Sequence, residues 1–351
     1  MSTAKVAIIT RTKNRTILLR RAIESVLAQS FADWHMVIVN DGGEPTEVDN
    51  LVAAYLLRAA GRITVIHHPV SKGMEAASNV GLKASQSEYV IIHDDDDSWD
   101  PAFLERSVET LEGCALPSVA GVVTHSIRVL ETLADGQVMI THQEPFNDWL
   151  EAVTLNRMAA TNLFPPISFM YKRSVLSEIG GYREDLPVRG DWEFNLRFLQ
   201  AFDIVVLPEL LALYHHRLEA SSGDYGNTVI GAQGKHVLYD ALLKNEFLRR
   251  DLKDEALGIG FFSNLYHGHE ATHSQIGRLH HDISRLHEHL SAFDAHMNNR
   301  LDVIEQQLEQ LIQRAQGLER RLEPSEGPLK RLLSRFTLRA KRKVADAERG
   351  G

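Results

Sequence analysis

The stretch that decides the fold reads Tyr89-Val90-Ile91-Ile92-His93-Asp94-Asp95-Asp96-Asp97. Its first half is apolar, β-branched and too short for a helix, which predicts a buried strand. Four adjacent carboxylates follow, and their mutual repulsion is costly unless a cation lies among them. Oxygen ligands at the end of a strand suit magnesium or manganese, above all where phosphates complete the coordination. The alternative is a solvated acidic turn, and the run alone leaves both open.

Strands and helices alternate around this run through residues 5–100. The apolar pattern predicts strands over 6–10, 35–40, 63–67 and 89–93, and helices over 16–29, 48–60 and 74–84. Alternation with short connections is typical of an α/β fold, a mostly parallel sheet flanked by helices. Further strands are expected over 119–124 and 137–141, and a helix over 191–202.

Three polar clusters follow the ends of predicted strands, at residues 10–15, 40–43 and 94–97. The carboxyl ends of parallel strands share one edge of a sheet, where ligands bind. Neither GxGxxG nor GxxxxGK[ST] occurs in the chain, so the sequence predicts neither a dinucleotide fingerprint nor a P-loop.

Charge is unevenly distributed along the 351 residues. The net charge is −9, but residues 328–351 carry +6 and the remainder −15. An acidic body is a poor nucleic-acid binder, whereas a basic tail suits an anionic surface. A single cysteine and the lack of a long apolar run favour a protein of the cytoplasm that does not span a membrane.

A heptad pattern runs from Gln275 to Leu322, with one stutter between Met297 and Leu301. A long helix with a single apolar seam needs a partner, so we expect a parallel homo-oligomer, dimer or trimer. An antiparallel hairpin within one chain is the alternative. The apolar positions are Ile276, Leu279, Ile283, Leu286, Leu290, Phe293, Met297, Leu301, Ile304, Leu308, Leu311, Ala315, Leu318 and Leu322.

The C-terminal tail places Leu329, Leu332, Leu333 and Phe336 on one helical face among many Lys and Arg residues. This pattern predicts a basic amphipathic helix on anionic lipid, with nucleic-acid contact or a disordered end as alternatives. The expected organisation is therefore a catalytic domain over 1–225, a helical extension over 226–274, a coiled coil over 275–323 and the tail over 324–351.

Together these segments resemble family 2 glycosyltransferases of the GT-A fold. The resemblance is specific over residues 5–105, weaker through 220 and absent beyond about 225. The stretches that carry it are Ile8 to Arg15, Ala22 to Ser30, Val37 to Gly43, Lys72 to Gly81, and Tyr89 to Asp97 with Trp99 and Pro101.

The resemblance implies inverting transfer of a sugar from a nucleotide-diphosphate donor, aided by manganese or magnesium. Asp94 and Asp96 match the DxD motif, and the implied metal ligands are Asp96, Asp97 and a late histidine, His216 or His215. The residues implied to contact the donor are Thr10, Arg11, Asn14, Arg15, Asp41, Lys72, Asn79, Asp94 and Asp95. Asp95 is the position at which the family varies, so we expect it to be replaceable.

Two positions depart from the family pattern. Asn40 stands where the family often has an aspartate before Asp41, and Ser78 where it often has an arginine before Asn79. The second change removes a cation near the phosphates, for which Lys72 is a candidate substitute.

The resemblance also implies a catalytic base in an acidic pair before a short helix. Asp191 fits that position, followed by Arg197, and Glu193 is the rival base. An inverting displacement needs one carboxylate to accept the proton of the attacking hydroxyl. An Asp at a helix start is also a common N-cap, and both roles stay open.

The expected function is transfer to a growing, lipid-linked surface polysaccharide by an enzyme lying on the inner face of the cell membrane. Two alternatives stay open: a sugar-phosphate nucleotidyltransferase, and a coiled-coil scaffold carrying a degenerate transferase domain.

Overall fold

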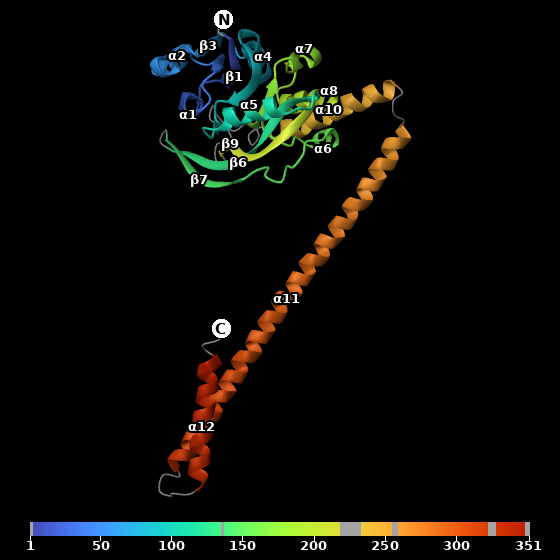
Figure 1. Cartoon of the computed structure of the whole chain (residues 1–351). Helices are drawn as coiled ribbons and strands as arrows, with labels where there is room; N and C mark the ends of the chain where they lie inside the picture. The colour runs from blue at the N-terminus through green and yellow to red at the C-terminus, as the bar shows by residue number, and fades with distance from the viewer. Residues whose placement is uncertain (1–2, 135–136, 218–232, 255–258, 322–327, 348–351) are drawn as a thin grey trace. The chain divides into compact units, whose positions relative to one another are not determined.

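The computed structural model describes residues 3–134, 137–217, 233–254, 259–321 and 328–347. The chain divides into two compact units, Met1–Arg250 and Asp251–Gly351 (Figure 1). The strands of the first unit are β1 Thr3–Thr12, β2 Trp34–Asp41, β3 Ile63–His68, β4 Gln86–Asp94, β5 Ser98–Trp99, β6 Val119–Ala134, β7 Gln137–Pro145, β8 Phe169–Lys172 and β9 Asp203–Arg217.

Helices connect most of these strands. They are α1 Thr16–Leu27, α2 Pro45–Ala53, α3 Leu56–Ala59, α4 Met74–Ala84, α5 Phe103–Gly113, α6 Leu155–Ala160, the short 3-10 helix η1 Pro166–Ser168, α7 Val175–Ile179, α8 Gly190–Ala201 and α10 Gln233–Lys253. The helix predicted over 48–60 is interrupted between α2 and α3, and Ala60 ends α3 in a left-handed conformation.

The described strands form one sheet in the order β3-β2-β1-β4-β8-β6-β9-β5, with β7 paired to β6. The first four strands are parallel, as predicted. The second half is mixed, because β8 runs antiparallel to both β4 and β6 while β9 is parallel to β6. The expected GT-A type α/β architecture is therefore confirmed, but the sheet as a whole is mixed rather than mostly parallel. Apolar periodicity identifies a strand and carries no information about its direction.

Alternate side chains of the strands enter two separate cores. Ile8 and Ile91 face α1, α2 and α5, whereas Ile9 and Val90 face α4, α8 and α10. This period of two requires helices on both faces and produces three layers. Gly81 of α4 lies so close to β1 that a Cβ there would be 2.4 Å from Ile9 Cγ2.

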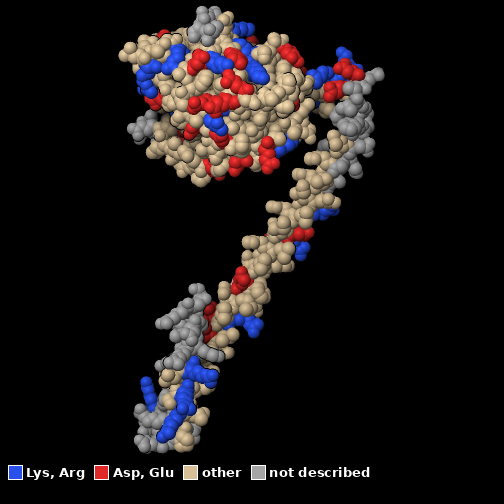
Figure 2. All heavy atoms as spheres, in the orientation of Figure 1, with Lys and Arg blue, Asp and Glu red and all other residues tan. Residues whose placement is uncertain are grey.

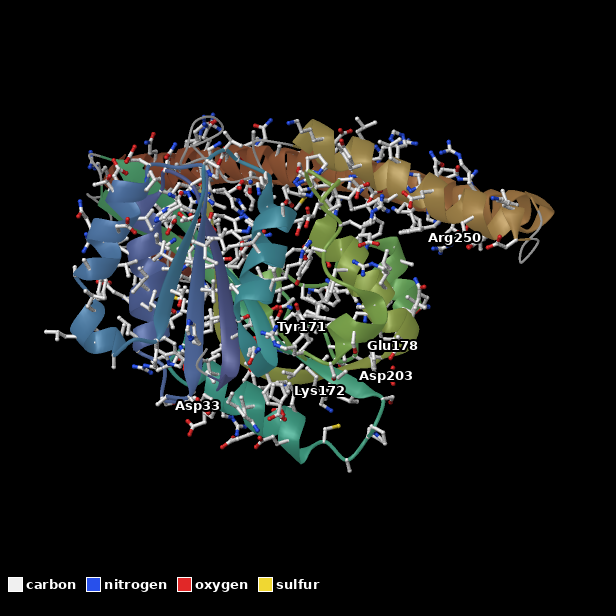
Figure 3. All side chains as sticks on the ribbon, turned by 90° about the horizontal axis from the view of Figure 1, so that it is seen from above. Asp33, Tyr171, Lys172, Glu178, Asp203 and Arg250 are labelled. Atoms are coloured by element: carbon white, nitrogen blue, oxygen red, sulfur yellow. The ribbon has the colours of Figure 1, made fainter. Side chains whose placement is uncertain are left out.

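The opposite ends of the parallel strands form two edges of the sheet. Figure 3 labels Asp33, Lys172 and Asp203, which mark the edge where β2 and β9 begin and the antiparallel β8 ends. A hollow of about 450 Å³ lies at that edge, beside Lys5, Asp33 and Arg173. The polar clusters predicted from the sequence lie at the opposite edge, where β1, β2 and β4 end.

The second unit contains α11 Ile259–Arg321 and α12 Pro328–Ala347, which contacts α11. Within this unit Ala315 of α11 and Thr337 of α12 are buried. The heptad residues from Ile276 to Met297 are between 40% and 63% exposed in the single chain. A continuous helix with an uncovered apolar seam agrees with the heptad pattern, and the pairing of that seam stays a prediction. Among the described helices none is long and apolar enough to cross a membrane.

Candidate active site

The acidic run lies at the carboxyl end of β4, surrounded by arginines. Arg11 Nε donates to Asp94 Oδ1 over 3.0 Å, and Arg15 Nη2 lies 2.6 Å from Asp95 Oδ1. Asp96 is paired with Arg217, at the end of β9, and lies 3.6 Å from Arg15 Nη1. Guanidinium groups therefore compensate much of the repulsion among these carboxylates, as a bound cation would.

Glu131 of β6 binds Arg217 together with Arg21 of α1 and His215 of β9. It is 2% exposed and accepts from Arg21 over 2.6 Å, from Arg217 over 2.7 Å and from His215 over 2.8 Å. Burial raises the pKa of Glu131, but the hydrogen bonds from His215 and Arg21 bring it down to about 2. Sequence reasoning missed this residue, because it lies more than 30 positions from the acidic run and belongs to no motif.

The two candidate histidines of β9 occupy different environments. His215 bonds to Glu131 through Nδ1 and to Ser98 Oγ through Nε2, so both ring nitrogens are engaged within the protein. His216 has a buried Nε2 that makes no hydrogen bond with the described residues, and burial lowers its pKa to about 4. A neutral imidazole with a vacant nitrogen is the form that binds metal, so the geometry favours His216 over His215.

Asp97 and Asp95 are the most enclosed carboxylates of the run, 1% and 0% exposed. Asp97 accepts from the backbone N–H of His215 over 2.9 Å, and burial raises its pKa well above the usual range. Burial likewise raises the pKa of Asp95 to about 6. The buried carboxylate of Asp95 pairs with Arg15, which argues against the expectation that Asp95 is replaceable, because its loss leaves the mostly covered Arg15 guanidinium without that carboxylate.

The first two loops are tied to each other and to the loop after β3. Asn14, with a left-handed φ of 53°, accepts from the backbone N–H of Glu44 over 3.1 Å. Asp41 accepts from His68, from Ser71 and from the backbone N–H groups of Lys72 and Gly73, over 2.6–3.0 Å. Asp41 therefore fixes the 68–73 loop, a role that the sequence did not indicate.

Three other residues that were predicted to contact the nucleotide-diphosphate donor lie in different environments. Thr10 is fully buried in β1, and Lys72 is exposed. Asn79 of α4 donates to Tyr182 O and to Glu184 Oε1, each over 2.8 Å, and accepts from Tyr182 N–H. Its amide is thus engaged in fastening α4 to the segment before α8.

Arg11 supplies a cation beside the position where the family pattern often has one. Its Nη1 donates to Ser78 Oγ over 3.3 Å, next to Asn79. The guanidinium of Arg11 therefore lies at Ser78, although Arg11 belongs to β1 and Ser78 to α4. Arg11, rather than the exposed Lys72, is the better-placed substitute.

Asp191 lies in the first turn of α8, which starts at Gly190 after the left-handed Arg189. It is inside the helix rather than its N-cap, so the capping explanation is wrong. Asn162 Nδ2 donates to Asp191 Oδ2 over 2.7 Å. Burial raises the pKa of Asp191, and the Asp94 carboxylate also acts on it in that direction. Asp191 and the acidic run therefore belong to one electrostatic site.

The carboxylate of the rival base, Glu193, is held in an ion pair with Arg197. Glu193 is 3% exposed, and Arg197 donates to both of its oxygens, over 2.8 Å from Nε and 2.7 Å from Nη2. Such a bidentate pair leaves Glu193 poorly suited to accept a proton.

A metal would find suitable ligand types here, although not a preformed cage. Within the described residues no three His, Cys, Asp or Glu side chains are gathered around one point. Arg11 and Arg217 pair with Asp94 and Asp96 instead. His216, whose Nε2 makes no hydrogen bond with the described residues, and Asp94, Asp96 and Asp97 nevertheless have side chains of the types that bind such a cation.

Comparisons with known proteins agree with this geometry. The family model "Glycosyl transferase family 2" matches residues 7–180. The uncharacterized glycosyltransferase YwdF of Bacillus subtilis is 25% identical over 235 residues, which cover 67% of this chain and 81% of YwdF. A PGL/p-HBAD biosynthesis glycosyltransferase of Mycobacterium tuberculosis is 25% identical over 261 residues, covering 74% of this chain and 88% of that protein.

Among solved structures, the crystal structure of S. aureus TarS 1-349 aligns with a TM-score of 0.47 at 19% identity, covering 60% of each chain. The family model takes in both the sheet edge and the acidic run that follows β4. The chain accordingly belongs to glycosyl transferase family 2, and it is a glycosyltransferase.

Proposed function

We propose that the protein transfers a sugar, with inversion, from a nucleotide-diphosphate donor to a hydroxyl group of a glycan acceptor. The observation that carries this proposal is the position of Asp191. Its carboxyl is half-buried, accepts from Asn162 Nδ2 over 2.7 Å, and has a pKa raised by burial and by the Asp94 carboxylate at the sheet edge. A base on one side and a cluster of charges for the leaving diphosphate on the other is the arrangement that an in-line displacement requires.

The chain's own residues supply most of this chemistry. Asp191 accepts the proton of the acceptor hydroxyl as its oxygen attacks the anomeric carbon. The bond from that carbon to the diphosphate then breaks, and negative charge grows on the leaving phosphate. Arg11 and Arg15, both at the same sheet edge, stabilise that charge.

A divalent cation, manganese or magnesium, completes the proposal. Asp96, Asp97 and His216, together with Asp94, would hold it, and when bound it would neutralise the donor diphosphate. Asp94 and Asp96 are paired with Arg11 and Arg217. The donor's phosphate oxygens offer these arginines new partners, so ligand and metal can enter by an exchange of ion pairs.

Release of nucleotide from a panel of donors, with manganese, magnesium or EDTA, tests the proposal. We expect release of UDP or GDP in the presence of an acceptor extract, and its loss in EDTA. Pyrophosphate release would instead favour a sugar-phosphate nucleotidyltransferase. No product with any donor would favour a coiled-coil scaffold and contradict the transferase proposal.

The acceptor is proposed to be a lipid-linked surface polysaccharide, reached by an enzyme lying on the inner face of the cell membrane. Figure 2 shows Lys and Arg side chains gathered on α12, and Leu332 and Phe336 of that helix are 74% and 65% exposed. Exposed apolar residues beside basic ones suit the surface of an anionic bilayer. The relatives of this chain include a PGL/p-HBAD biosynthesis glycosyltransferase and a putative colanic acid biosynthesis glycosyl transferase.

Removal of residues 324–351 should release the protein from liposomes that contain anionic lipid. The basic and apolar side chains of α12 supply the attraction, so sedimentation with vesicles should fall to the level seen with neutral lipid. A matched variant, Arg331→Glu with Arg335→Glu, should lose binding while keeping the helix. Undiminished sedimentation of the truncated chain would remove the membrane proposal.

A further inference from the structure

Glu75, the second residue of α4, carries a buried carboxyl group that the proposed reaction does not use. Glu75 is 4% exposed, and its Oε2 makes no hydrogen bond with the described residues. The nearest cation is Arg11, whose Nη1 is 3.7 Å from Oε2, beyond hydrogen-bond distance. Leaving a buried oxygen of this kind unsatisfied costs free energy, which a ligand that supplies a donor recovers.

Glu75 lies between the donor side and the acceptor side of the site. On the donor side it adjoins Arg11, which bonds to Asp94. On the acceptor side its carboxyl lies against Gly190, the residue before Asp191. A Cβ at Gly190 would be 2.3 Å from Glu75 Oε1 and 2.4 Å from its Cδ. A glycine at this position therefore makes room for the Glu75 carboxyl.

The group that must lie between diphosphate and base during transfer is the sugar itself. We propose that Glu75 binds a hydroxyl group of the transferred sugar, through the carboxyl oxygen that lacks a partner. The assignment rests on the proposed function, because it takes the sugar to span from the Asp94 side to Asp191. Sugar hydroxyls donate well to carboxylate oxygens, and a buried acceptor aimed at one of them selects sugars by its position.

The competing role is that Glu75 only anchors Arg11. The contacts of Arg11 argue against it, since Nε and Nη2 are bonded to Asp94 and Nη1 to Ser78. The two roles predict different losses. A sugar contact affects only ligands that carry the sugar, whereas an anchor for Arg11 affects every ligand that carries the diphosphate.

The test is calorimetric binding to the full chain and to its Glu75→Ala and Glu75→Gln variants. The probes are UDP and GDP, together with UDP-glucose, UDP-N-acetylglucosamine and GDP-mannose. For the sugar nucleotide that the wild type binds best, Glu75→Ala should weaken affinity about 10–100-fold, the range for a lost hydrogen bond to a charged group. Affinity for the bare diphosphate should change less than about twofold, and Glu75→Gln, which keeps an acceptor oxygen, should fall between.

Glu209→Gln is the matched control, because it removes a carboxylate that pairs with Arg106 elsewhere on the domain. It should leave both affinities unchanged. Equal losses for diphosphate and sugar nucleotide would overturn the assignment, and so would unchanged affinity in Glu75→Ala. If Glu75→Ala unfolds, the isosteric Glu75→Gln decides by the same comparison. A wild type that binds none of the probes would overturn the proposed function together with this inference.

Discussion

Replacing Asp191 with Asn should lower kcat about 10²–10⁴-fold, the contribution typical of a general base. The amide keeps the size of the carboxyl and can still accept the hydrogen bond from Asn162, so the fold and donor affinity should be retained. What is lost is the ability to accept the acceptor's proton. Steady-state kinetics at saturating donor and acceptor, with the melting temperature measured alongside, gives the result.

The pH dependence provides a second readout for Asp191. Burial raises the pKa of this carboxyl, so it stays protonated, and inactive as a base, to a higher pH than an ordinary aspartate of pKa about 3.9. Activity should therefore rise with pH through the raised pKa, and Asp191→Asn should abolish that limb of the profile. Near-normal turnover in Asp191→Asn, or a larger kcat loss in Glu193→Gln, would refute the assignment of the base.

Local sequence pattern was enough to predict the elements that build the sheet edge. Strand β4 and its acidic run are contiguous, and α4 extends over the predicted 74–84. Both follow from hydrophobic period and length, which are properties of a short segment. The same holds for the gathering of loops at one edge, because parallel strands must end together.

The sequence did not predict which charged residues of the site pair with one another. Glu131, Arg21 and Arg217 meet only because β6, α1 and β9 converge, and nothing in their local sequence shows it. Glu75 is similar, a polar residue in a helix whose burial depends on Gly190, more than 100 positions away. The order of the strands in a mixed sheet determines which charged residues pair. Hydrophobic periodicity identifies the strands but carries no information about their order.

Substitution of seam residues of α11 should reveal how two copies of this helix meet. We propose that the seam pairs in parallel and in register with the same seam of a second copy. The exposed residues Leu286 and Leu290, 60% and 58% exposed in the single chain, would be buried by such pairing. Helices of this length with one apolar face are stabilised chiefly by a partner helix.

The charges that flank the seam support this register. The seven positions of a coiled-coil repeat are written a to g, with apolar residues at a and d. In a parallel coiled coil the g residue, which directly precedes an a residue, faces the e residue five places later on the other helix. That rule sets Asp282 opposite His287, His289 opposite Asp294, and Arg300 opposite Glu305. Each pair combines a carboxylate with a basic side chain, and the last lies beyond the stutter between Met297 and Leu301.

The lone cysteine of the chain makes the arrangement measurable. In a Cys114→Ser background, Leu286→Cys should give a covalent dimer within minutes of mild oxidation, because identical seam positions lie within disulfide reach only when the helices are parallel and in register. Ser284, two residues before Leu286, lies on a different face of the helix and is exposed. Ser284→Cys is therefore the matched control and should stay reduced. Ile283→Asp with Leu290→Asp should convert the oligomer to monomer by light scattering, because each buries a carboxylate in the seam. A wild-type chain of monomeric mass, or equal crosslinking at 284 and 286, would show that the seam is covered by something other than its own copy.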